Sequence, residues 1–343
     1  MTSQSLTDTP VTSRPSLKPI PVAFNGRGGE YFGIWIVNIA LTVLTLGIYS
    51  AWAKVRNKRY FYGNTDVAGA SFEYLATGGQ ILKGRLIAVA VFVAFSMISS
   101  FISPEVYGLF MLAFMLAMPW LINAGLRFNA RYSAYRGVRF RFTGTYWAAF
   151  KAFFLYPLLG MITLGIMMPH AMHYAARYVV TNHAYGNKAF KFDATVKQYQ
   201  SVVLGLVIGI IASIALIAIG FSQVSIAMIA VGYLAIYGLS LAFKPLLFNV
   251  YWQGVNLEKN RFEANMPVGR FIWVFISNSI VVALTLGLAF PWAQVRLARL
   301  NANSLTFLHA GNLGSIAASQ AKEMSAVGEE LGEVYDVDVG FGI

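Results

Sequence analysis

The sequence has no cysteine and few charged residues, since Asp, Glu, Lys and Arg together make up 12% of its 343 residues. Without cysteine the chain can form neither a disulfide nor a metal site built on thiolates. A soluble domain carries about 25% charged residues, whereas 57% of the residues here are hydrophobic. This composition indicates a membrane protein.

Acidic residues are scarce, and none lies in the middle of an apolar stretch. Outside the two ends of the chain they are Glu30, Asp66, Glu73, Glu105, Asp193, Glu258 and Glu263. A buried acid–base pair or a metal centre usually needs such a group within reach. His170 and His173 follow Pro169 but have no carboxylate nearby in the sequence, so they do not predict a metal site. We therefore expect no enzyme activity, no metal and no cofactor.

Long apolar stretches, in contrast, are abundant. Four of them approach the roughly 20 residues that a helix needs to cross a bilayer: 81–101, 107–126, 202–221 and 224–243. The Ser-, Thr- and Pro-rich start of the chain predicts a flexible tail over residues 1–21, and the polar, acidic end predicts another over 311–343. The membrane domain is expected between them, over residues 22–310.

The basic residues are confined to six segments, separated by apolar blocks that contain no Lys or Arg. These blocks cover residues 28–53, 86–126, 152–176, 198–243 and 271–295. If each block crosses the membrane and returns as a helical hairpin, all 26 basic residues share one side, which the positive-inside rule makes cytoplasmic together with both termini. Alternatively, the first, third and fifth blocks cross once, which places 177–197 and 244–270 outside. We expect the five hairpins.

Three of these blocks contain the same short break, Thr-Leu-Gly. Its glycines, Gly47, Gly165 and Gly287, suit the left-handed conformation that ends a helix, and Pro169 and Pro291 suit the first turn of the next helix. In the first copy Ala51 stands in place of the proline. The break predicts a helix, a tight turn and a second helix.

The copies align well beyond the break. Residues that meet at an offset of 240 are Asn38 and Asn278, Trp52 and Trp292, Arg56 and Arg296, and Arg59 and Arg299, while an offset of 118 aligns Arg59 with Arg177. The membrane domain thus reads as about 2.5 parallel repeats, over residues 22–145, 146–265 and 266–310, related by an axis along the membrane normal.

Short connectors on the basic side alternate aromatic and charged residues, as in Phe72-Glu73-Tyr74 and Phe140-Arg141-Phe142. A period of two is typical of β-strands, so these connectors predict β-hairpins that form a small cytoplasmic sheet. The expected fold is an all-α polytopic membrane protein with this sheet attached.

The segment FNGRGGEYFGIWIVNIALTVLTLGIYSAWAKVRNKRYFYGNT at 24–65, followed by GASFEY at 69–74, resembles the YjgN-like family of bacterial inner-membrane proteins. The resemblance extends over about residues 22–310, with Ala51 where a proline is usual before Trp52. It implies an integral inner-membrane protein and supplies no activity and no catalytic residues.

Arg56 and Arg296 are the first residues to consider for function. Arg56 lies nine residues after Gly47, about 13 Å at the helical rise, so if the turn lies at the periplasmic interface this arginine falls inside a hydrocarbon core about 30 Å thick. Such an arginine either lines a cavity that receives anions or extends to lipid phosphates where the bilayer is thin.

The remaining candidates have structural alternatives. Asn38 and Asn278 lie within the first helices of their hairpins, where they either face a cavity or hydrogen-bond between helices. Trp52 and Trp292 either gate a pore or pack at the interface. We add Arg59, Arg177 and Arg299 as further anion-binding candidates.

The expected partners are anionic membrane lipids or a small anionic solute, and not nucleic acid, because the basic connectors lie beside the membrane. The hypothesis is a transporter or channel-like protein for an anionic small molecule or lipid. The alternative is a non-catalytic scaffold that organises lipids or envelope partners. No oligomeric state is predicted.

Overall fold

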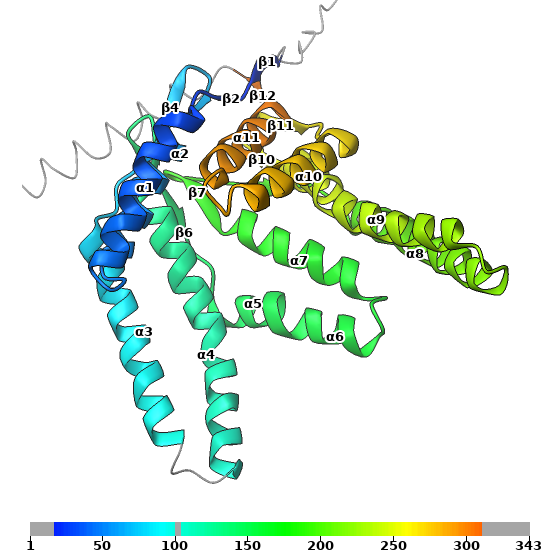
Figure 1. Cartoon of the computed structure of the whole chain (residues 1–343). Helices are drawn as coiled ribbons and strands as arrows, with labels where there is room; N and C mark the ends of the chain where they lie inside the picture. Colours follow the sequence, from blue (N-terminus) through cyan, green and yellow to red (C-terminus); the bar gives the residue numbers. More distant parts are fainter. Residues whose placement is uncertain (1–16, 100–103, 311–343) are drawn as a thin grey trace, which may run out of the picture.

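The computed structural model describes residues 17–99 and 104–310. This part is mostly helical, and its helices extend from antiparallel strands that gather at one end of the molecule (Figure 1). Within it, four helical segments are long and apolar enough to cross a membrane: Gly78–Met97, Val106–Arg131, Val196–Ser222 and Ile226–Gln253. The expectations of a mainly helical chain with candidate membrane spans and antiparallel strands are confirmed.

The described helices lie in five consecutive groups. They are α1 (Gly28–Leu44) with α2 (Ser50–Gly63); α3 (Gly78–Ser99) with α4 (Pro104–Arg131); α5 (Tyr146–Phe150), the π-helix η1 (Lys151–Leu155) and α6 (Tyr156–Ile162) with α7 (Met168–Thr181); α8 (Val196–Ser222) with α9 (Ile226–Gln253); and α10 (Val268–Leu284) with α11 (Phe290–Asn303). Groups that follow one another in the chain are packed together, and α11 packs against α1, so the last group lies beside the first (Figure 1).

Short strands separate the helix groups. They are β1 (Lys18–Pro21), β2 (Ala23–Phe24), β3 (Thr65–Val67), β4 (Ala70–Tyr74), β5 (Ser133–Tyr135), β6 (Val138–Phe142), β7 (His183–Tyr185), β8 (Lys188–Ala189), β9 (Lys191–Phe192), β10 (Val255–Leu257), β11 (Asn260–Ala264) and β12 (Leu305–His309). Strands β2 to β8 pair in chain order, as do β9 to β12, and β12 pairs with β1.

These pairings close on themselves. Only Val22 separates β1 from β2, and its N–H donates to the carbonyl of Leu305 on β12 at 3.0 Å. Only Phe190 separates β8 from β9, and its N–H donates to the carbonyl of His183 on β7 at 3.0 Å. Backbone pairing, together with these two continuous stretches of chain, therefore links all the described strands from β1 back to β1, and we call this arrangement the strand ring.

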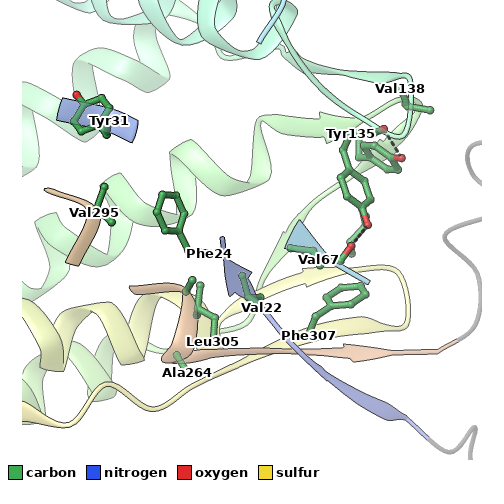
Figure 2. Close-up of a cluster of buried hydrophobic side chains, with 13 residues drawn as sticks. Val22, Phe24, Tyr31, Val67, Tyr135, Val138, Ala264, Val295, Leu305 and Phe307 are labelled. Atoms are coloured by element: carbon green, nitrogen blue, oxygen red, sulfur yellow. Dashed lines mark hydrogen bonds between the residues drawn. The ribbon is translucent and has the colours of Figure 1, made fainter. Parts of the chain in front are cut away.

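One buried apolar cluster, part of which Figure 2 shows, draws side chains from strands around the ring and from the helices beside it. Its members are Val22, Phe24, Tyr31, Val67, Tyr135, Val138, Tyr185, Leu257, Ala264, Val295, Ala302, Leu305 and Phe307. Aromatic side chains join this cluster from the strands: the ring of Phe140 stacks on those of Phe72 and Phe190 at centroid distances of 6.4 and 6.3 Å. Aromatic packing therefore holds the strand ring together.

The Thr-Leu-Gly turn depends on all three of its residues. In the first copy both Leu46 (φ 48°) and Gly47 (φ 93°) adopt the left-handed conformation. The hydroxyl of Thr45 donates to the carbonyl of Leu41 at 2.7 Å and accepts from the N–H of Tyr49 at 2.9 Å. This one side chain thus satisfies a backbone group of the helix that ends and another of the helix that begins.

The other two copies form the same turn. The left-handed residues there are Leu164 (φ 51°), Gly165 (φ 93°), Leu286 (φ 48°) and Gly287 (φ 90°). Thr163 and Thr285 repeat both threonine hydrogen bonds. Pro169 and Pro291 lie in the first turns of α7 and α11, and Ala51 occupies the corresponding place in α2.

Each helix group is also tied to the start of the next one. Three residues connect the strand before each helix group to the first helix of that group. The carbonyl of the middle residue of this connection contacts a polar side chain on the last helix of the group before it; for the first group, the contact comes from the last group, which lies beside it. The pairs are Arg299 with Gly26 (2.9 Å), Arg59 with Ala76 (3.1 Å), Arg127 with Gly144 (2.8 Å), His173 with Ala194 (2.9 Å) and Asn249 with Met266 (3.2 Å). We call these contacts the linker bonds.

One strand lies within the predicted N-terminal tail. Strand β1 covers Lys18–Pro21, within the segment 1–21 that the sequence analysis placed in a flexible tail. Its backbone pairing with β12, which side-chain composition does not reveal, explains this difference. The predicted tail over 311–343 lies outside the described residues.

Candidate functional site

An arginine–asparagine pair lies beside the first helix break. Nη1 of Arg56 on α2 donates to Oδ1 of Asn38 on α1 at 3.2 Å and to the hydroxyl of Tyr49 at 3.2 Å. Asn38 is buried and donates through Nδ2 to Oδ1 of Asn57 at 2.9 Å. Because both polar atoms of Asn38 are bonded, its side chain holds one end of the Arg56 guanidinium in place.

The last helix group contains the same pair. Nη1 of Arg296 on α11 donates to Oδ1 of Asn278 on α10, again at 3.2 Å, and to the hydroxyl of Ser277 at 2.7 Å. Nδ2 of Asn278 donates to the carbonyl of Ala293 at 3.2 Å. Residues that the offset of 240 aligned in the sequence thus form the same arginine–asparagine contact, although the further partners of each residue differ between the two copies.

Both arginines keep donors for an anion. Arg56 and Arg296 are exposed, and a guanidinium has five N–H groups in a planar fork that matches a phosphate or carboxylate. Among the described residues the ion pairs are Arg27–Glu30 at 3.9 Å and Lys188–Glu258 at 2.7 Å. No described carboxylate therefore neutralises either arginine.

The other predicted arginines differ from this pair. Arg59 donates to the carbonyls of Tyr74 and Ala76 at 3.2 and 3.1 Å, and Arg299 donates to the carbonyl of Gly26 at 2.9 Å, so both form linker bonds and hold the backbone. Arg177 is exposed on α7 and lies apart from both arginine–asparagine pairs in the sequence.

Trp52 and Trp292 pack over glycines at the start of neighbouring helix groups. A Cβ atom on Gly78 of α3 would lie 2.4 Å from Cγ of Trp52, and one on Gly28 of α1 would lie 2.2 Å from Cδ1 of Trp292. Each indole occupies the space where a side chain would otherwise stand, which is a packing role. Trp292 also contacts the ring of Phe32 at a centroid distance of 4.8 Å.

The histidines do not form a ligand set. Nε2 of His173 lies 2.9 Å from the carbonyl of Ala194, where it forms a linker bond, and His170 leaves Nδ1 buried without a hydrogen bond. Within residues 17–99 and 104–310, no three His, Asp or Glu side chains come together in a way that could hold a metal ion.

Sequence reasoning missed the linker bonds of Arg127 and Asn249 and the capping role of Thr45, Thr163 and Thr285. The threonines could have been found from their threefold recurrence before Leu-Gly. The linker bonds left a weaker signal, because Arg59 and Arg299 recur at the offset of 240 but the other groups use Arg127, His173 and Asn249.

Residues 19–334 match the family model described as "Bacterial protein of unknown function (DUF898)". The chain belongs to this family. Relatives of this DUF898 member include the inner membrane protein YjgN of Escherichia coli O157:H7, 37% identical over 146 residues, and that of Escherichia coli K12, 38% identical over 146 residues. The YjgN of Salmonella typhimurium LT2 is 32% identical over 148 residues.

These matches are partial. Those with the two Escherichia coli proteins cover 41% of this chain and 36% of each relative, and the Salmonella match covers 43% of this chain and 37% of its relative. The chain therefore spans little more than a third of the length of the curated relatives that it matches. No solved structure matches this DUF898 protein.

Proposed function

We propose that the protein is a multi-pass protein of the bacterial inner membrane that binds an anionic small molecule or lipid and moves it, as a transporter or channel-like protein. The observation that carries this proposal is the pair of exposed arginines, Arg56 and Arg296, each held by an asparagine next to a helix break and neutralised by no described carboxylate. The four candidate spans and the similarity to the inner membrane protein YjgN support the location.

The length of the helices supports a position for these arginines inside the membrane. Helix α1 has 17 residues and α2 has 14, which correspond to about 25 and 21 Å against a hydrocarbon core of about 30 Å. The first helix group is therefore either re-entrant or spans a locally thinned bilayer. In both cases Arg56 lies well below the headgroups unless its side chain extends toward them.

The orientation follows from charge. With both termini and the strand ring in the cytoplasm, all 26 basic residues lie on one side, as the positive-inside rule favours. Arg56 and Arg296 then face an anionic leaflet or an anionic solute of the cytoplasm. The membrane-embedded repeats would be related by an axis along the membrane normal.

The test replaces both arginines. The double variant Arg56→Gln and Arg296→Gln is compared with wild type in proteoliposomes, with uptake of radiolabelled inorganic phosphate and co-purification of anionic lipid as readouts. We expect at least one readout to fall by about tenfold or more, since a single charge-assisted bond contributes about 1.5–3 kcal/mol. Lys54→Gln, which removes an exposed charge from the same helix, is the matched control. Unchanged lipid binding together with unchanged flux would contradict the proposal.

A non-catalytic scaffold for lipids or envelope partners is the second candidate. It is favoured by the strand ring, whose buried cluster draws on strands from all around it and is reinforced by stacked aromatic rings such as Phe72, Phe140 and Phe190. Such packing suits a rigid platform better than a moving gate. Lipid binding that depends on Arg56 and Arg296, without flux above that of protein-free vesicles, would favour the scaffold.

A further inference from the structure

A basic pocket lies where the end of α4 meets strand β6, away from Arg56 and Arg296. Its cavity volume is about 850 Å³, within the range of pockets that hold small ligands. Four arginines line it, Arg127 and Arg131 from α4 and Arg139 and Arg141 from β6, with Glu73 as the acid among the lining residues. Four positive charges less one negative charge leave a formal charge of +3.

The four arginines form two closely spaced pairs. Arg139 and Arg141 are two residues apart on one strand, so their side chains leave the same face about 7 Å apart. Arg127 and Arg131 are one helical turn apart, with Cβ atoms about 6 Å from each other. Like charges this close repel one another, and none of the four forms an ion pair with a described carboxylate. An anion bound between them would relieve the repulsion.

The pair of positive charges of Arg139 and Arg141 on β6 is not needed to form the strand ring, because the equivalent strands do not carry such a pair. Strands β4, β6 and β11 each have five residues, and their second and fourth residues are exposed. At the fourth position β4 has Glu73 and β11 has Glu263, whereas β6 has Arg141. The negative end of the helix dipole favours basic residues near the C-terminus of a helix, which accounts for those at the end of α4. The dipole does not explain Arg139 and Arg141, because they lie on a strand.

The described partners leave these groups available. Arg127 uses Nη2 for its linker bond to the carbonyl of Gly144 at 2.8 Å, which fixes it at one wall of the pocket. Arg131, Arg139 and Arg141 are exposed, and no described side chain neutralises them. Three exposed guanidinium groups beside one anchored group can bind phosphate oxygens in bidentate pairs.

We propose that this pocket binds a phosphate group that carries at least two negative charges. Two sources have this chemistry: a soluble diphosphate and the phosphomonoester headgroup of a membrane lipid. The pocket does not include Arg56 or Arg296, so it can be occupied whether or not those residues handle an anion.

The test uses the full chain in nanodiscs of zwitterionic phosphatidylcholine. Binding of pyrophosphate is measured by isothermal titration calorimetry, and binding of phosphatidic acid is measured by its enrichment around the protein in nanodiscs doped with that lipid. The double variant Arg139→Gln and Arg141→Gln removes two phosphate ligands without removing a linker bond. We expect it to weaken binding of the source that the wild type prefers by about a hundredfold, or about tenfold per arginine.

The matched control is Arg261→Gln. Arg261 occupies the second position of β11, as Arg139 does in β6, but does not line the pocket. It should bind both probes like wild type. If the variant with Arg139→Gln and Arg141→Gln does not fold, Arg131→Gln serves as a second test, and it should weaken binding of the preferred probe by about tenfold.

The two sources give different results. Pyrophosphate binding that the strand variant abolishes supports a soluble ligand, and enrichment of phosphatidic acid that the same variant abolishes supports a lipid ligand. The proposal is overturned if the wild type binds neither probe, or if Arg139→Gln with Arg141→Gln binds as tightly as Arg261→Gln.

Discussion

Replacing Gly78 by alanine should destabilise the protein through one steric contact. The new Cβ would lie 2.4 Å from Cγ and 2.5 Å from Nε1 of Trp52, closer than real Cβ atoms approach other heavy atoms. The indole is 38% exposed, so part of the overlap can be relieved by its movement. Overpacking of this kind costs about 1–3 kcal/mol. We therefore expect Gly78→Ala to lower the thermal unfolding midpoint in detergent, followed by tryptophan fluorescence.

The neighbouring glycine provides the control. A Cβ on Gly79 would meet nothing within 4 Å, and alanine is a better helix former than glycine by about 1 kcal/mol, so Gly79→Ala should unfold no earlier than wild type. A double-mutant cycle with Trp52→Ala isolates the contact, because Gly78→Ala should cost nothing once the indole is gone. Equal midpoints for the two alanine variants, or a cost that persists without Trp52, would refute this reasoning.

Asn249→Ala should lower the free energy of unfolding by about 2–4 kcal/mol in chemical denaturation, because it removes both hydrogen bonds to the buried Met266, at 3.2 and 2.7 Å. Asn129, which follows a phenylalanine as Asn249 does, is exposed and accepts a hydrogen bond from the ammonium of Lys58 at 2.6 Å. Asn129→Ala should cost about 1 kcal/mol or less, because this contact to a charged group lies at the surface, and equal losses in the two variants would count against the linker bond. Burial lowers the pKa of His183 below its usual value, so its protonation favours the unfolded chain. The stability that the neutral His183 side chain contributes should be fully present above about pH 6.5 and be lost as the pH falls through the lowered pKa. The variant His183→Gln should therefore show a weaker dependence of the thermal unfolding midpoint on pH. A slope identical to that of wild type would contradict the assignment.

Much of the helical architecture could be predicted because it depends on local signals. Apolar length identified the long helices, and Thr-Leu-Gly with Pro169 and Pro291 marked the turns, since backbone conformation and capping depend on residues close in the sequence. The left-handed leucines, Leu46, Leu164 and Leu286, were not predicted, because leucine rarely adopts positive φ. There the threonine hydroxyl and the following glycine stabilise a conformation that leucine alone disfavours.

The closure of the strand ring could not be predicted. It depends on the pairing of Lys18–Pro21 with Leu305–His309, two segments at opposite ends of the described chain. Alternation of side chains shows that a strand exists but not which strand lies beside it. The arginine–asparagine pairs were easier to recognise from the sequence than the ring, because both the arginine and the asparagine recur at the offset of 240. The pocket at Arg139 and Arg141 interrupts the repeat and therefore gave no comparable signal.

The pairing of β1 with β12 has a consequence for biosynthesis. The segment from Lys18 is made before the other described strands, whereas its partner, Leu305–His309, is among the last described residues to be made. Local helix groups can insert and pack as they are synthesised, whereas this contact of high sequence separation must wait. Closure of the ring therefore has to follow synthesis of Leu305–His309, and a chain truncated before that segment would leave Lys18–Pro21 without its partner strand.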